Sequence, residues 1–240
     1  MNGVLFTAAG RSGSLDFCIR YLQEAGIPFA PQAEDSATHL LLPVPTLDGQ
    51  GHIKGDGTLE EVLAKVPAAT IIGGNLPPLP GRVCIDLLQD EVFICQNAHI
   101  TAHCAMALAA EHLDTTFRDC RCLILGWGRI GKCLAEVMGR LEARVSVAAR
   151  NPRDRAILEA LGYESMSPGA IDPAAYDLIF NTAPELLLPD CKGSALKIDL
   201  ASKPGITGSD VIWARGLPGK MAPAAAGKLM ALRILYYIKE

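Results

Sequence analysis

A glycine-rich turn between an apolar run and a helical pattern constrains this chain more than any other feature. Residues 122–125 read Cys-Leu-Ile-Leu and are followed directly by Gly126-Trp127-Gly128-Arg129-Ile130-Gly131. In a G-x-G-x-x-G turn the first glycine allows the bend, the second lets backbone approach a diphosphate, and the third lets strand and helix pack closely. Amide groups at the start of the helix then face the phosphates. The motif predicts a dinucleotide-binding Rossmann domain; the alternative is a tight strand-to-helix turn without a ligand.

The end of the next apolar run indicates which dinucleotide is bound. In domains that prefer NAD(H), an acidic residue about 20 positions beyond the motif accepts hydrogen bonds from the adenosine ribose. Here the run 143–150 ends in Arg150 and is followed by Asn151, so a guanidinium replaces the carboxylate. It can pair with the 2′-phosphate of NADP(H), and Arg129 and Arg153 are near enough in sequence to assist. We expect NADP(H) to be preferred and NAD(H) to be the alternative; otherwise Arg150 is an exposed arginine without a ligand.

Apolar runs alternate with helical patterns along the rest of the chain. The expected strands are 3–9, 38–45, 69–74, 122–126, 143–150, 176–184, 195–202 and 210–219, and the expected helices include 14–26, 58–66, 130–141 and 152–161. Such alternation implies parallel sheets. We predict an α/β protein with two Rossmann-like, dehydrogenase-like domains, residues 1–96 and 97–240, of which the second carries the glycine motif and begins with a hinge helix.

The final helix is assigned to the second domain, with two alternatives open. Its apolar side chains include Leu229, Leu232 and Leu235. These would equally suit a return to the first domain or a contact between two chains, and we expect a homodimer.

Composition and charge exclude several other classes of protein. The chain has 240 residues and a formal net charge of −4, so the basic surface typical of nucleic-acid or anionic-membrane binding is not expected. The apolar stretch 221–238 is interrupted by charges and predicts an amphipathic helix rather than a membrane span. Eight cysteines without a secretory leader indicate a reducing cytoplasm. No C-x-x-C pair is present, and a zinc site formed by His99, His103 and Cys104 would lack a further ligand, so no metal is expected.

Five ordered runs resemble a known family. They are 123–135, 145–164, 177–184, 197–205 and 214–231, and they are similar to the nucleotide domain of the dipicolinate synthase A-subunit family. The resemblance covers residues 97–240, whereas 1–96 are only loosely similar and the chain is shorter than typical members. It implies a two-domain dehydrogenase-like fold that oxidises dihydrodipicolinate to pyridine-2,6-dicarboxylate with NADP⁺ during sporulation, in the mother-cell cytoplasm. It also implies a second, flavoprotein-like subunit.

The candidate site residues follow successive strands, because ligands of open α/β sheets lie beyond the carboxyl ends of the strands. Asn181, Thr182, Ala183 and Pro184 are expected beside the nicotinamide or its ribose, as the resemblance to dehydrogenases suggests. A dicarboxylate substrate requires cations and fixed donors. The expected groups, facing an interdomain cleft, are Arg11, Ser12, Asn97, Thr101, Lys203 and Lys220; the alternative for each cation is a solvated surface side chain. Ser202 and Lys203 are further catalytic candidates.

Oxidation of a dihydropyridine releases a hydride and a proton, so a base is helpful. All five histidines precede the glycine motif, and His99 and His103, four positions apart, would share a helix face. They are the candidate bases; the alternative is a structural or exposed role. Family members read Glu-Gly where this chain has His103-Cys104. The alternatives are therefore a divergent NAD(P)-dependent dehydrogenase for another small carboxylate, or a non-catalytic nucleotide-binding subunit. A 2-hydroxyacid dehydrogenase is disfavoured because no histidine follows residue 112.

Overall fold

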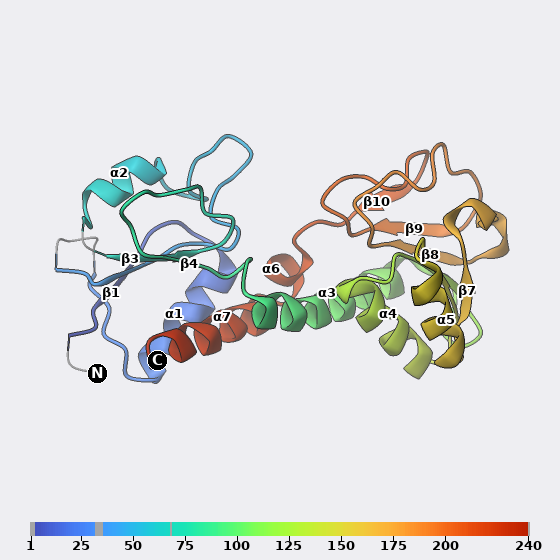
Figure 1. The fold of residues 1–240 in the computed structure, drawn as a ribbon, viewed down its shortest axis with the longest axis horizontal. Helices are drawn as coiled ribbons and strands as arrows, with labels where there is room; N and C mark the ends of the chain where they lie inside the picture. Colours follow the sequence, from blue (N-terminus) through green and yellow to red (C-terminus); the bar gives the residue numbers. More distant parts are fainter. Residues whose placement is uncertain (1–2, 32–35, 68, 240) are drawn as a thin grey trace. The chain divides into compact units, whose positions relative to one another are not determined.

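The computed structural model describes residues 3–31, 36–67 and 69–239. The chain divides into two compact units (Figure 1). The first unit comprises Met1–Asn97 and Pro218–Glu240, and the second comprises Ala98–Leu217. Each unit is built around a parallel sheet, as the alternation of strand and helix patterns predicts.

The first unit contains a four-stranded parallel sheet in the order β1-β2-β3-β4. The strands are β1 (Phe6–Ala8), β2 (His39–Leu41), β3 (Thr70–Gly73) and β4 (Cys84–Asp86). On one face, the short helix α2 (Leu59–Ala64) packs its apolar side chains against Leu40, Leu42 and Ile71. Its N-terminus has a capping box in which Thr58 and Glu61 bond each other's backbone.

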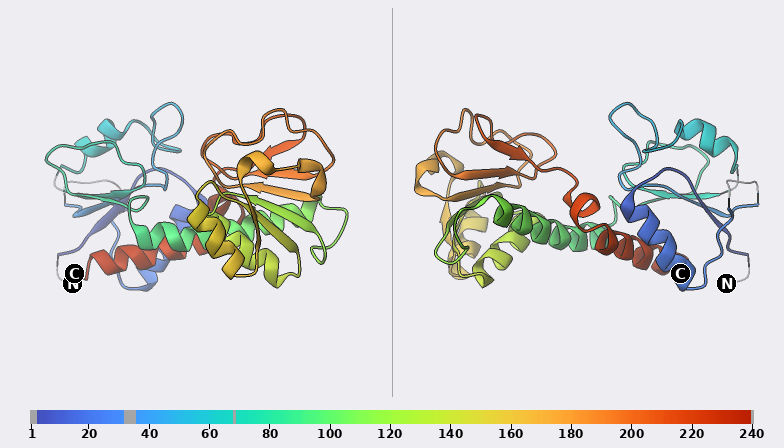
Figure 2. Two further views of the ribbon diagram at one scale, coloured as in Figure 1. Left: turned by 45° about the vertical axis from the view of Figure 1, so that its right-hand side comes forward. Right: turned by 180° about the vertical axis from the view of Figure 1, so that it is seen from behind.

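Two further helices of this unit come from opposite ends of the chain. Helix α1 (Gly13–Glu24) lies beside the C-terminal helix α7 (Pro223–Tyr237), as Figures 1 and 2 both show. The contact is close, because a Cβ atom on Gly227 would lie 2.5 Å from the Ser14 carbonyl oxygen. The assignment of the final helix to the second domain is therefore wrong, and the alternative of a return to the first domain is the one observed.

Helix α3 (Glu91–His112) is a single helix of 22 residues that begins in the first unit and ends in the second. The segment Asn97–Cys104 lies inside it. Among the described helices, α3 alone has the length and composition of a membrane span, with a mean hydropathy of 1.2, a test that core helices of globular proteins also pass.

The second unit contains six parallel strands in the order β10-β9-β8-β5-β6-β7. They are β5 (Arg121–Leu125), β6 (Arg144–Ala148), β7 (Glu164–Met166), β8 (Leu178–Asn181), β9 (Leu196–Asp199) and β10 (Val211–Trp213), with helices α4 (Arg129–Arg140) and α5 (Pro152–Ala160). Two single 3₁₀ turns, Pro168–Ala170 and Pro173–Ala175, precede β8, and the short helix α6 (Leu217–Met221) precedes α7. Counted along the chain this is the strand order 3-2-1-4-5-6 of doubly wound nucleotide-binding sheets, whose order reverses between β5 and β8.

Two strands have no counterpart among the expected ones. Both β4 and β7 are three-residue strands at a sheet edge and are partly exposed. A short, half-exposed strand has little hydrophobic pattern of its own, and its pairing with a neighbour decides its conformation.

Candidate dinucleotide site

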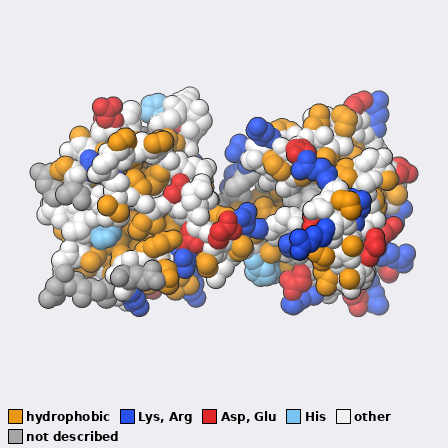
Figure 3. Space-filling model, in the orientation of Figure 1, with side chains coloured by type: hydrophobic (Ala, Val, Ile, Leu, Met, Phe, Trp, Pro, Cys, Tyr) orange, Lys and Arg blue, Asp and Glu red, His pale blue; other side chains and the backbone are white. Residues whose placement is uncertain are grey.

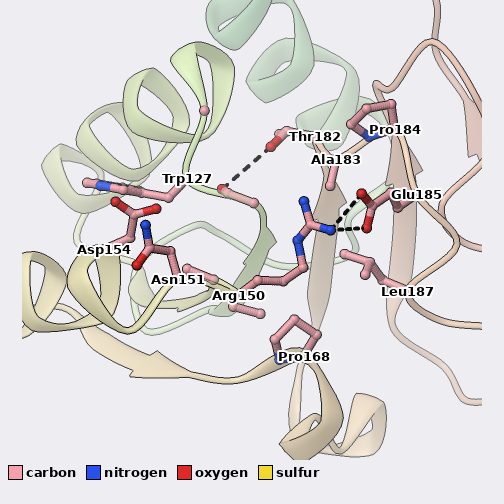
Figure 4. A pocket seen from close by; sticks show the side chains of 14 residues that line it. Trp127, Arg150, Asn151, Asp154, Pro168, Thr182, Ala183, Pro184, Glu185 and Leu187 are labelled. Atoms are coloured by element: carbon pink, nitrogen blue, oxygen red, sulfur yellow. Dashed lines mark hydrogen bonds and ion pairs between the residues drawn. The ribbon is translucent and has the colours of Figure 1, made fainter.

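A pocket of about 300 Å³ lies at the carboxyl ends of β5, β6 and β8 (Figure 4). This is the point where the strand order reverses, which is where ligands bind in open α/β sheets. The described residues that line it are Gly126, Trp127, Gly128, Ala148, Ala149, Arg150, Asn151, Asp154, Pro168, Thr182, Ala183, Pro184, Glu185 and Leu187.

The glycine turn has the close packing that its three glycines predict. Gly126 has a φ of +99°, a conformation that favours glycine. A Cβ atom on Gly131 would lie only 2.2 Å from the Gly126 carbonyl oxygen, so helix α4 begins directly against the turn. The Thr182 hydroxyl donates a hydrogen bond of 2.8 Å to the Leu125 carbonyl and ties the end of β8 to the end of β5.

The N-terminus of α4 fits a bound diphosphate. Helices α1, α2 and α5 have their N-termini capped by the side chains of Ser12, Thr58 and Asn151, whereas the N-cap of α4 is Gly128, which provides no side-chain cap. Apart from Gly128 itself, its two chain neighbours and the adjacent backbone of α4, no described atom lies within 4 Å of the position of a Cβ atom on Gly128. Open space in front of an uncapped helix start suits an anion that accepts hydrogen bonds from backbone N–H groups.

Arg150 follows β6 and points across the pocket to Glu185. Its Nη1 atom lies 2.6 Å from Oε1 and 2.5 Å from Oε2 of Glu185. Both side chains are accessible, with 70% and 47% of their surface exposed. The carbonyls of Ala149 and Arg150 each accept a hydrogen bond of 2.8 Å from Arg155, which holds the backbone at the end of β6.

A buried polar network supports the turn after β8. The Asn181 amide donates to Asp199 at 2.8 Å and exchanges hydrogen bonds with the backbone of Ala183. Asp199 also accepts bonds from the N–H groups of Ala201, Gly205 and Ile206, and neither side chain is exposed. The Asn181 side chain therefore fixes the backbone of the turn after β8 from its buried side.

The structure brings most of the predicted cofactor residues to one place. Among them, Gly126, Trp127, Gly128, Arg150, Asn151, Thr182, Ala183 and Pro184 line the pocket. Arg129, Ile130 and Gly131 form the first turn of α4, and Arg153 is an exposed residue of the first turn of α5. Asn181 lies beneath the pocket and is not among the residues that line it.

The predicted substrate and catalytic residues are divided between the two units. Arg11, Ser12, Asn97 and Lys220 belong to the first unit, and His99, Thr101, His103, Ser202 and Lys203 belong to the second. Arg11, Lys203 and Lys220 are exposed, whereas Thr101 is buried. Ser12 caps α1 by accepting a hydrogen bond from the Leu15 N–H. The roles proposed for all of these residues stay predictions.

The two candidate bases share one face of α3, as their spacing predicts. The ring centroids of His99 and His103 lie 4.6 Å apart in an edge-on arrangement, and both side chains are exposed. Cys104 is buried. In the part of the chain that the structure describes, no group of three His, Cys, Asp or Glu side chains is arranged to hold a metal ion.

Two acidic residues of the pocket are absent from the sequence-based site. Glu185 directly follows the turn after β8, and Asp154 lies in the first turn of α5, beside Asn151 and Trp127 in Figure 4. Each directly follows a predicted cofactor residue, Pro184 or Arg153, and this adjacency in the sequence is the signal that could have identified them. In Figure 3, Lys and Arg side chains are interspersed with acidic ones over the second unit.

Strand order, glycine turn and pocket together define a dehydrogenase-like, doubly wound α/β fold with an open pocket at the reversal of its strand order. No known protein-family profile matches the chain. The A-subunit of dipicolinate synthase from Bacillus subtilis (strain 168) is 28% identical over 234 residues, which covers 85% of this chain and 77% of the relative. The chain is a homologue of this dipicolinate synthase A-subunit, so the resemblance inferred from its motifs is confirmed.

Solved structures share the fold. The dipicolinate synthase A-subunit from Bacillus halodurans has a TM-score of 0.83 at 23% identity, covering 99% of this chain and 98% of that chain. A transhydrogenase from Sinorhizobium meliloti has a TM-score of 0.70 at 12% identity, covering 98% of this chain and 93% of that chain. The prediction of a dehydrogenase-like α/β fold with parallel sheets is confirmed.

Proposed function

We propose that the protein is an NADP-dependent oxidoreductase that oxidises dihydrodipicolinate to dipicolinate. Its Bacillus subtilis relative is named as a dipicolinate synthase subunit, and the family resemblance implies the substrate and the cofactor. The observation that carries the proposal is the pocket at the reversal of strand order, where the glycine turn meets the uncapped start of α4. The backbone at Gly126, Trp127 and Gly128 would hold the diphosphate, and the turn Thr182-Ala183-Pro184 would orient the nicotinamide or its ribose.

The reaction removes one hydride and one proton from the substrate ring. When bound, NADP⁺ would supply the hydride acceptor. The proton passes to a base or to water, and His99 and His103 are the proposed bases, with Ser202 and Lys203 as further catalytic candidates. Because aromatisation of the ring already favours the products, the base contributes less than correct placement does.

A dicarboxylate substrate would be held by cations and polar donors. Arg11, Lys203 and Lys220 are exposed cations that can meet a carboxylate. Ser12, Asn97 and Thr101 complete the proposed set. NADP(H) preference rests on Arg150, which lines the pocket at the end of β6, and NAD(H) is the alternative. By the family resemblance the protein would work in the mother-cell cytoplasm of a sporulating bacterium. We expect it to be a homodimer.

A second candidate function is nucleotide binding without turnover. The relative is named as one subunit of a synthase, which favours a partner chain, and the family resemblance suggests a flavoprotein-like one. In that case the pocket would bind the dinucleotide while the partner performs the chemistry. A dehydrogenase for another small carboxylate is the third alternative, because His103-Cys104 replaces the family's Glu-Gly pair.

Trp127 provides a direct test because it lines the pocket and the chain has two tryptophans. In Trp213→Phe only Trp127 remains, and we expect its fluorescence to be quenched by NADPH and NADH in a saturable way. The matched variant Trp127→Phe should lose this signal. Formation of NADPH from NADP⁺ and dihydrodipicolinate by the isolated protein would support the enzyme, saturable binding without turnover would support the nucleotide-binding role, and absence of binding would refute both.

A further inference from the structure

The cation on which NADP(H) preference depends is already engaged within the protein. Arg150 donates to both carboxylate oxygens of Glu185 through one nitrogen, Nη1, at 2.6 and 2.5 Å. The two residues come from the ends of β6 and β8 and reach toward each other across the pocket (Figure 4). A 2′-phosphate approaching Arg150 would therefore meet the Glu185 carboxylate.

The charge balance of the pocket makes this encounter unfavourable. Among the described residues that line it, Arg150 is the one cation, and Asp154 and Glu185 are two acids. With Arg150 paired, the wall presents an excess of negative charge to a phosphate that carries close to two negative charges. A cofactor without the 2′-phosphate does not incur this repulsion.

The ion pair is nevertheless easy to open. An exposed pair of this kind shifts an equilibrium by a factor of about five at most. A phosphate is the stronger partner for a guanidinium, because it forms charge-assisted and often bidentate hydrogen bonds. Since Arg155 holds the backbone carbonyls of Ala149 and Arg150, only the Arg150 side chain needs to change partner.

We propose that Glu185 is a specificity-determining residue, which competes with the 2′-phosphate for Arg150 and thereby narrows the preference for NADP(H) over NAD(H). This inference rests on the proposed function. In this proposal the Glu185 carboxylate determines whether the pocket selects NADP(H) over NAD(H) strongly or weakly. NAD(H) affinity should be nearly independent of Glu185, because NAD(H) offers Arg150 no phosphate at this position.

The test compares NADPH and NADH affinities of Glu185→Gln by fluorescence titration of the Trp213→Phe protein. Glutamine keeps the size of the side chain and removes its charge, and Glu185→Ala is a second variant if glutamine disturbs folding. We expect the dissociation constant for NADPH to fall about two- to fivefold and that for NADH to change less than about twofold. In an Arg150→Gln background, Glu185→Gln should have a smaller effect on NADPH, because the competition no longer exists.

Asp154→Asn is the matched control, since it neutralises the other acid of the pocket and leaves the Arg150–Glu185 pair in place. A smaller gain in NADPH affinity than that of Glu185→Gln supports the proposal. An equal gain would mean that pocket charge in general matters. Unchanged NADPH binding by Glu185→Gln would mean that Glu185 does not compete for Arg150, and weaker binding would mean that Glu185 positions Arg150. Each of these results overturns the proposal. If the unsubstituted protein binds neither cofactor, the proposed function itself fails, which is a distinct result.

Discussion

Asp90 and Arg233 lie 143 positions apart in the sequence and form a largely buried ion pair, with 2.7 Å between Oδ2 of Asp90 and Nη2 of Arg233. The Tyr237 hydroxyl donates to the same oxygen at 2.9 Å. The other oxygen of Asp90 accepts hydrogen bonds from the N–H groups of Val92 and Phe93 at the start of α3. One carboxylate thus caps α3 and holds α7 in the first unit.

We expect Asp90→Ala to lower the free energy of unfolding by roughly 3 kcal/mol or more, because it leaves the largely buried Arg233 guanidinium without its partner and removes a helix cap. Urea unfolding followed by circular dichroism measures this. The control is Glu136→Gln, which breaks the exposed pair with Arg140 on α4 and should cost less than about 1 kcal/mol. Equal losses in the two variants would contradict a structural role for the buried pair.

The stability provided by Asp90 should depend on pH. Burial raises the pKa of Asp90, but hydrogen bonds from Phe93, Arg233 and Tyr237 outweigh it, so the pKa in the folded protein lies below the ordinary value. The unfolded chain takes up this proton at a higher pH than the folded one does. The stabilisation is therefore complete above the ordinary pKa of about 4 and is lost as the pH falls through the lowered pKa.

The measurement for this prediction is the difference in unfolding free energy between the unsubstituted protein and Asp90→Asn, followed from about pH 6 to about pH 3. We expect the difference to shrink on acidification. A difference that stays constant over that range would exclude the titration of Asp90 as its cause.

Two glycines of the dinucleotide turn should respond differently to alanine. A Cβ atom on Gly131 would collide with the Gly126 carbonyl oxygen, so Gly131→Ala should destabilise the second unit by about 2 kcal/mol or more. Gly128→Ala meets open space and should leave stability within about 1 kcal/mol, yet weaken NADPH binding at least tenfold by occupying the diphosphate position. Thermal unfolding and the Trp127 titration separate the two effects, and tight NADPH binding by Gly128→Ala would count against the site.

The packing of α7 on α1 gives a prediction about the C-terminal helix. Gly227→Ala places a methyl group 2.5 Å from the Ser14 carbonyl oxygen and 2.6 Å from Cβ of Phe17, and should cost about 2 kcal/mol of stability. Gly219→Ala is the matched control, because its nearest neighbour, the Ser14 hydroxyl, lies at an ordinary contact distance of 3.6 Å. If both variants melt at the same temperature as the parent, the α1–α7 contact does not limit stability.

Much of the second unit could be predicted from local patterns. The helices expected at 130–141 and 152–161 are observed at Arg129–Arg140 and Pro152–Ala160. Their starts are encoded locally, by the glycine turn in α4 and by the Asn151 cap with Pro152 in α5. The strand, the turn and the helix at the glycine motif are specified by residues that are adjacent in the sequence. For this reason the motif could be placed correctly, and most of the predicted cofactor residues line one pocket.

The sequence by itself determined the two parallel sheets, the glycine turn and the presence of Arg150 where a carboxylate is common. Only the tertiary structure decided that α7 joins the first unit, that β4 and β7 complete the sheet edges, and that Arg150 is paired with Glu185. The physical reason is the sequence separation over which the interactions act. Helix caps, turns and hydrophobic periodicity depend on a few neighbouring residues. The partners of Arg233 and Arg150 lie 143 and 35 positions away and meet them only when the chain has packed.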